Sequence, residues 1–223
     1  MYTLSPYPQG SEVFNHYNEL PNSQLLVRFG FALLGNDLDA VNLSLPGPSE
    51  DSAQPGDRAR ARILRHRGLK LSHELRRGTF DAAGRDDGGP AVGGILDTVR
   101  VLYLADGAAA AYLAAHGDAD AADAPPLGRL VGPAASAQAA SALLGALRGL
   151  AARYDGSAAA DAAALAAAPP AGEGLSARAR RNVAVVRSGE RAILAANVAA
   201  LERLQRGWAD EAAAAAGAAA VIL

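Results

Sequence analysis

The spacing of apolar residues along the chain predicts a mostly helical protein. The clearest pattern starts at Ser176, where apolar residues return every three or four positions, and it predicts a long helix over 175–215. Arg187, Glu190 and Arg191 lie on or near the flank of this helix, beside its apolar face. The apolar stripe itself consists of Val183, Val186, Ile193, Leu194, Leu201 and Leu204.

Shorter helices are predicted between residue 58 and this long helix. The helix predicted over 93–105 carries a second apolar stripe along one face. Segments rich in Gly, Asp and Pro predict loops over 81–94 and 117–133. The second stripe consists of Leu96, Val99, Leu102 and Tyr103, and the other helices are predicted over 58–67, 107–116, 134–154 and 157–167.

Three short segments have the residue types of strands. The segment 12–17 is short and aromatic, and the segment 40–45 has the sequence AVNLSL, so each predicts one strand. The segment 69–80, with the sequence LKLSHELRRGTF, predicts a short hairpin. Strands are therefore expected on both sides of the polar segment that begins at residue 46.

A short helix is predicted between the first two strands. Asn22 is a residue type that caps helices, and Leu25, Leu26 and Phe29 then fall on one face. Gly30 follows directly and predicts the end of the helix, because glycine readily adopts the conformation of a tight exit.

The chain changes character near residue 46. Most aromatic residues precede this point, whereas Ala-rich helical patterns follow it. The segment 46–57 is polar and rich in Pro, Gly and Ser, which is typical of a linker. We therefore predict a mostly α member of the α+β class, with a small strand-bearing unit over 1–45 and a helical domain over 58–215.

The composition excludes several classes of site and partner. The 223 residues carry a formal net charge of −2, so no bulk attraction to nucleic acid or to an anionic membrane is expected. The absence of cysteine excludes disulfides, cysteine zinc sites and a thiol nucleophile. No apolar run reaches the roughly 18 residues of a membrane span, and the N-terminal segment lacks the features of a secretory signal. We expect neither nucleic acid nor membrane among the partners.

Several charged or glycine-rich patterns favour ordinary surface structure over a binding site. The basic run from Arg58 to Arg67 spreads around a helix without aromatic neighbours, which favours a solvated face over a nucleic-acid site. The four histidines are too widely separated to form a metal motif. The glycines of 84–94 lack the ending of a phosphate-binding loop, and the acidic residues of 118–123 lack the Gly and Glu of a calcium loop.

A series of spaced motifs occupies residues 10–43. A Gly-x-Glu turn leads into a short strand ending in Tyr, and an Asn with a Leu-Leu pair, an aromatic-Gly-Phe triplet and an Asn-x-x-Asp motif follow. The order and spacing resemble the end of the SET domain in the Rubisco large-subunit methyltransferase group of protein-lysine methyltransferases. The matching residues are Gly10, Glu12, Phe14, Tyr17, Asn22, Leu25, Leu26, Phe29, Gly30, Phe31, Asn36 and Asp39.

Two segments after residue 57 resemble the helical substrate-binding domain of the same group. Residues 181–194 resemble its long helix, which carries an Arg-x-Gly-Glu-(basic)-x-Ile-Leu motif. Residues 96–104 are similar to its helix with a Leu-x-x-x-Arg-(apolar)-Leu pattern. The resemblance is therefore closest over 10–43 and more diffuse in the residues that follow.

The resemblance implies transfer of a methyl group from S-adenosyl-L-methionine to the ε-amine of a lysine in a protein substrate. Tyr17 would then orient the amine through its hydroxyl, and Phe29 and Phe31 would line the lysine channel or lie beneath it. A plain strand aromatic is the alternative for Tyr17, and ordinary core residues are the alternative for the two phenylalanines. The sequence departs from the group at Asn18, where Gly is usual, and at Phe29, where Tyr is common.

The motifs that hold the methyl donor in this group, a Gly-x-Gly segment and an Asn-His pair, precede the part that this sequence resembles. Asn15 and His16 come too late in the pattern to be that pair. We therefore expect an incomplete fragment that is inactive alone and binds S-adenosyl-L-methionine poorly. The alternative hypothesis is a non-catalytic helical module for protein interaction. The resemblance implies an intracellular protein, located in the chloroplast, nucleus or cytosol.

Overall fold

The computed structural model describes residues 8–11, 19–80, 90–117, 126–154, 157–167 and 175–221. In this part of the chain, seven helices and one two-stranded sheet are present, which confirms the predicted mostly α form of the α+β class. The elements are α1 (Asn22–Phe29), β1 (Ala40–Ser44), α2 (Pro55–His66), β2 (Ser72–Arg76), α3 (Pro90–Leu102), α4 (Asp106–His116), α5 (Leu127–Ala152), α6 (Ala158–Ala166) and α7 (Leu175–Val221).

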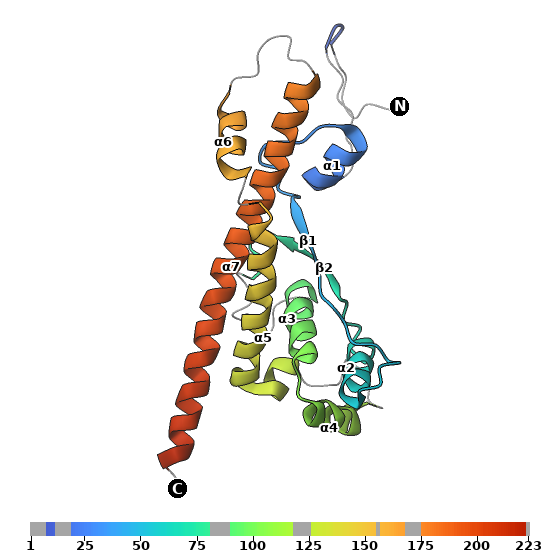
Figure 1. Ribbon diagram of the computed structural model, residues 1–223, viewed down its shortest axis with the longest axis vertical. Helices are drawn as coiled ribbons and strands as arrows, with labels where there is room; N and C mark the ends of the chain where they lie inside the picture. The colour runs from blue at the N-terminus through green and yellow to red at the C-terminus, as the bar shows by residue number, and fades with distance from the viewer. Residues whose placement is uncertain are drawn as a thin grey trace.

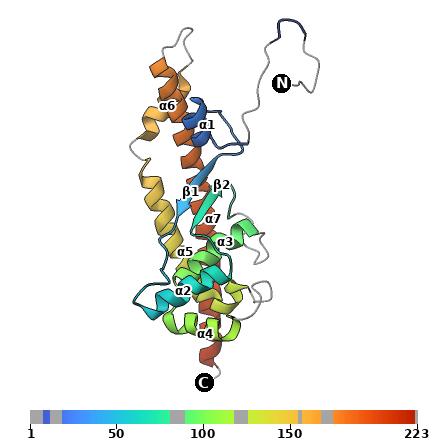
Figure 2. The same cartoon turned by 90° about the vertical axis from the view of Figure 1, so that its right-hand side faces the viewer.

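The molecule is elongated because the 47-residue helix α7 runs along most of its length (Figure 1). Helix α5 lies antiparallel beside it, and α1 and α6 pack on its N-terminal part (Figures 1 and 2). Helices α2 and α4 pack on each other near the opposite end. The long helix therefore connects the segment that contains the spaced motifs to the rest of the protein.

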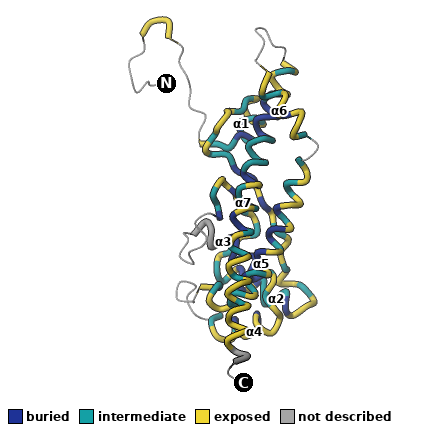
Figure 3. The backbone as a smooth tube through the Cα atoms, turned by 90° about the vertical axis from the view of Figure 1, so that its left-hand side faces the viewer, coloured by how far each residue is buried: buried dark blue, intermediate teal, exposed yellow. Residues whose placement is uncertain are grey.

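The main core lies where α3, α5, α7 and the sheet meet (Figure 3). The apolar stripe predicted on α7 is largely confirmed, because its middle and C-terminal members are buried or partly buried there. Tyr103 is exposed beyond the end of α3, so its assignment to the second stripe is wrong. The fully buried residues of this core include Leu75, Phe80, Ile95, Val99, Leu143, Leu147, Ile193, Leu194 and Leu201.

A second, smaller core joins α2, α3 and α4. Ile63, Val101 and Ala109 are fully buried in it. On the outside of α2, the Arg60 guanidinium donates to the Leu104 carbonyl and to the Asp106 carboxylate at 2.7 and 2.8 Å. Part of the basic run therefore binds neighbouring loops and helices.

The sheet pairs residues that are far apart in sequence. Strand β1 runs antiparallel to β2, with Ala40 opposite Arg76 and Ser44 opposite Ser72. The strand predicted over 40–45 is confirmed, whereas the hairpin predicted within 69–80 is wrong. The segment holds a single strand because its backbone pairs with the distant strand β1 while Leu75 enters the core, which local alternation does not reveal. The sheet also joins the two predicted units, whose boundary at residue 45 stays a prediction.

The six helices predicted after residue 57 are present. Helix α5 begins earlier than predicted because a helical turn precedes a kink at Gly132 and Pro133, where Gly132 has φ 74° and ψ 175°. Helix α2 likewise begins at Pro55, inside the predicted linker 46–57. The strand predicted over 12–17 lies outside the described residues.

By length and composition alone, α5 could cross a membrane, and no other helix in the described ranges meets that test. Leu143, Leu144 and Leu147 of α5 are buried in the main core against α7. A core helix of this kind satisfies the same criterion. The expectation of no membrane partner stays a prediction.

Candidate functional site

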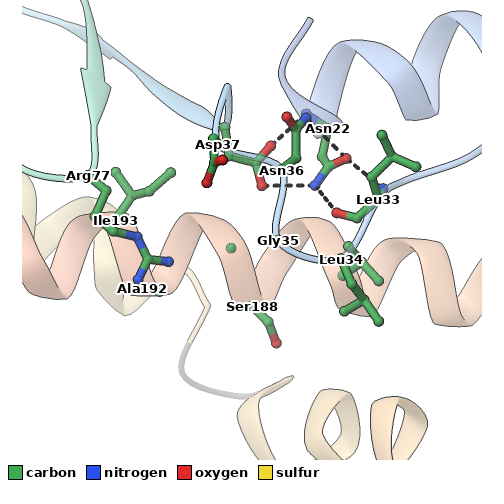
Figure 4. A pocket seen from close by; sticks show the side chains of 13 residues that line it. Asn22, Leu33, Leu34, Gly35, Asn36, Asp37, Arg77, Ser188, Ala192 and Ile193 are labelled. Carbon is green, nitrogen blue, oxygen red and sulfur yellow. Dashed lines mark hydrogen bonds between the residues drawn. The ribbon is translucent and has the colours of Figure 1, made fainter.

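The side chain of Asn22 organises the loop that follows α1. This side chain is 1% exposed, and its Nδ2 donates to the Leu33 carbonyl at 2.8 Å and to Asp39 Oδ2 at 2.9 Å. Its Oδ1 accepts a 2.8 Å hydrogen bond from the Leu33 N–H (Figure 4). Asn22 is the first residue of α1 and makes no capping bond, so the prediction that it caps the helix is wrong. Its partners lie 11 and 17 residues further along the chain instead.

Asn36 and Asp39 complete this network. The Asn22 backbone N–H donates to Asp39 Oδ1 at 2.6 Å, so both oxygens of the carboxylate accept from Asn22. Asn36 Nδ2 donates to the Leu20 carbonyl at 2.9 Å, and its Oδ1 accepts from the Leu38 N–H at 3.0 Å. Residues 20–39, which comprise α1 and the segment that follows it, therefore form one loop-like unit closed by side-chain to backbone hydrogen bonds. We refer to this unit as the loop.

The closed loop is docked on helix α7 at two points. Gly30 ends α1 in the left-handed conformation, with φ 78°, and its carbonyl accepts a 2.9 Å hydrogen bond from Asn182 Nδ2. At Gly189, a β-carbon would lie 2.6 Å from Asp39 Oδ2, so a larger residue would push the carboxylate away. The glycine of the Arg-x-Gly-Glu motif thus permits the close approach of the loop.

A pocket of about 490 Å³ lies between the loop and α7 (Figure 4). The loop contributes apolar and polar side chains, α7 contributes mostly small ones, and one arginine comes from the segment after β2. The lining residues are Asn22, Leu33, Leu34, Gly35, Asn36, Asp37, Asp39, Arg77, Val185, Ser188, Gly189, Ala192 and Ile193. This is the candidate site that the described residues offer beside the spaced motifs.

The rest of the Arg-x-Gly-Glu motif holds α6 and the end of α5 against α7. The Asp161 carboxylate on α6 is 1% exposed and accepts from Arg187 through Nε and Nη2 and from Arg191 Nη1 at 2.8 Å. Burial alone would raise the pKa of Asp161, but hydrogen bonds from Arg187, Arg191 and Ser157 lower it below the ordinary value. The two arginines therefore stabilise the ionised carboxylate.

Replacement of Asp161 by asparagine is expected to lower the free energy of unfolding at pH 7 by about 2 kcal/mol. The effect stays moderate because both arginines keep some contact with water. A depressed native pKa stabilises the fold above the unfolded pKa of about 3.9, and this contribution disappears as the pH falls through the native pKa. Urea denaturation at pH 7 and near pH 3 should show the difference between wild type and variant shrinking in acid. Asp210→Asn, at an exposed position on α7, is the matched control, and an equal loss in both variants would contradict this assignment.

Glu190 of the same motif binds the segment that follows α5. Its carboxylate accepts a 2.6 Å hydrogen bond from the Tyr154 hydroxyl. Burial raises the pKa of Glu190, the Tyr154 hydrogen bond lowers it, and the charge of Asp39 raises it again. Burial and the Glu190 contact together raise the pKa of Tyr154 to about 12. The phenol is therefore a stable donor at neutral pH.

The three site residues expected from the sequence fall in different surroundings. Tyr17 lies outside the described residues, so its role stays a prediction. Phe29 and Phe31 lie at the end of α1 with ring centroids 6.3 Å apart, and neither lines the pocket. Phe29, in the last turn of α1, is 45% exposed, whereas Leu25 one turn earlier is buried.

The site residues that sequence reasoning left without a role are Asp37, Arg77, Asp161 and Asn182. Only Asp161 carried a signal, since it is the single acid in an alanine-rich helix. Within the described ranges, no group of three His, Cys, Asp or Glu side chains could hold a metal ion. The described residues that line the pocket include no aromatic ring.

A scan of the chain against protein-family models found no match, and a search of curated proteins found none either.

Proposed function

We propose that the chain is part of a protein-lysine N-methyltransferase. In this proposal, residues 1–45 form the closing part of a SET domain that carries Tyr17, and residues 58–215 form the domain that binds the protein substrate. The reaction would move a methyl group from S-adenosyl-L-methionine to a lysine amine.

The observation that carries the proposal is the loop over residues 20–39. Each polar or glycine position of its spaced motifs has a defined structural role, since Asn22 and Asp39 close the loop, Asn36 fixes its ends, and Gly30 ends α1 and binds α7. A loop closed in this way holds the segment that follows Tyr17 in one geometry on the helical domain. Positioning of this kind is what in-line transfer to an amine requires, because alignment supplies part of the barrier reduction.

The Arg-x-Gly-Glu motif in the N-terminal part of α7 supports the same proposal. The Arg-x-Gly-Glu motif that resembles the substrate-binding domain docks this loop through Gly189, and its two arginines and Glu190 hold the neighbouring helices. The two resembling segments therefore contact each other at the residues that carry the resemblance. Chance similarity of two unrelated segments would give no reason for that contact.

The test is the chemical identity of the product. The polypeptide is expressed in its own cells with a C-terminal tag and purified through that tag. It is then incubated with methyl-labelled S-adenosyl-L-methionine and the proteins of those cells. After acid hydrolysis, we expect the label in methylated lysine. Label confined to other amino acids, or no incorporation at all, would contradict the proposal. The second of these results would favour the non-catalytic interaction module.

A further inference from the structure

The pocket between residues 33–39 and α7 combines small residues of α7 with two exposed leucines. Its floor is lowered by the small residues Ser188, Gly189 and Ala192 on one face of α7. Leu33 and Leu34 form its wall, and they are 50% and 67% exposed. Exposed leucines beside a hollow are typical anchors for an apolar side chain of a partner.

Hydrogen bonds within the protein also hold the wall of the pocket in place without a ligand. Leu33 is held by two hydrogen bonds to the buried Asn22, and Asn36 is held by bonds to Leu20 and Leu38. Gly189 leaves the Asp39 carboxylate in direct contact with α7. A preformed wall and floor lower the entropic cost of binding, because the loop does not have to be ordered at that moment.

The charges around the pocket favour a cation. Asp37 and Asp39 line it and Glu190 lies next to Gly189, whereas Arg77 is the cation among the lining residues. Both Asp39 oxygens accept from Asn22, but in the described part of the chain no side-chain hydrogen bond or ion pair involves Asp37 or Arg77. Figure 4 places Asp37 and Arg77 toward one end of the pocket and Leu34 toward the other. The carboxylates outnumber the guanidinium, so a ligand that carries a positive charge is favoured.

We propose that this pocket binds a segment of the protein substrate in which an apolar residue adjoins an arginine or lysine. The apolar side chain packs against Leu33 and Leu34 over the small residues of α7, and the basic side chain pairs with Asp37. The identity of the partner rests on the proposed function, whereas the pocket, its wall and its charge do not.

The direct test is binding of matched peptides to the 223-residue chain by fluorescence anisotropy. The probes are fluorescein-labelled Gly-Ser-Leu-Arg-Gly-Ser and the same peptide with Glu in place of Arg. We expect saturable binding of the Leu-Arg peptide below about 1 mM, and about fivefold or more weaker binding of the Leu-Glu peptide. Equal binding of the two peptides, or no saturable binding of either, would overturn the proposal.

Substitutions of Asp37 and Arg77 should change the affinity for the Leu-Arg peptide in opposite directions. Asp37→Asn should weaken binding of the Leu-Arg peptide by about threefold, and Arg77→Gln should strengthen it by about twofold, since a repelling charge is removed. Both side chains are exposed, so the fold should tolerate the changes. Asp210→Asn and Arg206→Gln, at exposed positions in the last third of α7, should have no effect. Weaker binding with Arg77→Gln would instead identify an anionic or zwitterionic ligand and overturn the proposal.

The failure of this inference and the failure of the proposed function give different results. Peptide binding does not use the Tyr17 hydroxyl, so Tyr17→Phe should leave the anisotropy titration unchanged. Binding of the Leu-Arg peptide without any methyl transfer would contradict the proposed function alone. Methyl transfer without charge-selective binding would contradict the docking pocket alone.

Discussion

Replacement of Asn22 by alanine is expected to lower the free energy of unfolding by about 3 kcal/mol. The side chain makes four hydrogen bonds, two with the backbone of Leu33, one to Asp39 and one at 3.5 Å from Asn36, and it is almost fully buried. The change leaves the Leu33 N–H and carbonyl unpaired and frees one oxygen of the Asp39 carboxylate. Unpaired polar groups in such a position cost more than the hydrogen bonds contributed when they were made.

The measurement is urea denaturation of the variant, followed by amide hydrogen exchange. Exchange should accelerate first at residues 33–39, because they lose their anchor before the core of α5 and α7 is affected. Asn42→Ala is the matched control, since Asn42 is exposed on β1 and should change the free energy of unfolding by less than about 0.5 kcal/mol. A loss at Asn22 no larger than at Asn42 would show that the loop does not depend on this network.

The helices could be predicted because their cause is local. Apolar residues at helical spacing on α7 and α3 identify a face that must be buried, and the structure buries most of it. The exceptions lie at the ends, where Tyr103 projects beyond α3 and a helical turn precedes the kink at Gly132. Periodicity says little about the last turn of a helix, since caps and neighbours decide it.

The sheet and the polar site could not be predicted in the same way, because their partners are distant in sequence. Strand β2 looked like half of a local hairpin, yet its partner β1 lies about thirty residues earlier. Asn22 has the residue type of a helix cap, and its side chain instead bonds to Leu33 and Asp39. Residue type indicates that Asn22 makes hydrogen bonds, and only the fold determines with which atoms.

The motif on α7 shows a third case. Its arginines and glutamate were placed on the flank of the helix from periodicity, and their partners proved to be Asp161 on α6 and Tyr154 beyond α5. Both partners lie in alanine-rich surroundings that have little pattern of their own. The motif therefore has a structural role at each of its charged positions.

Tyr17 is the residue on which the proposed chemistry depends. A hydroxyl at fixed geometry orients the lysine amine for attack, and removal of such a positioned hydrogen-bonding group lowers the rate of transfer by about 100-fold or more. Phenylalanine keeps the ring and removes only the hydroxyl, so the fold should be preserved. Tyr103→Phe is the matched control, because Tyr103 is exposed and lies after α3, outside the motifs of residues 10–43.

The decisive measurement is the initial rate of label transfer from S-adenosyl-L-methionine to protein lysine. It compares the tagged polypeptide purified from its own cells with its Tyr17→Phe variant, both at equal, saturating donor. We predict that the rate falls by about 100-fold in Tyr17→Phe, with unchanged thermal unfolding, and that Tyr103→Phe retains the wild-type rate. Equal rates for wild type and Tyr17→Phe would contradict the account.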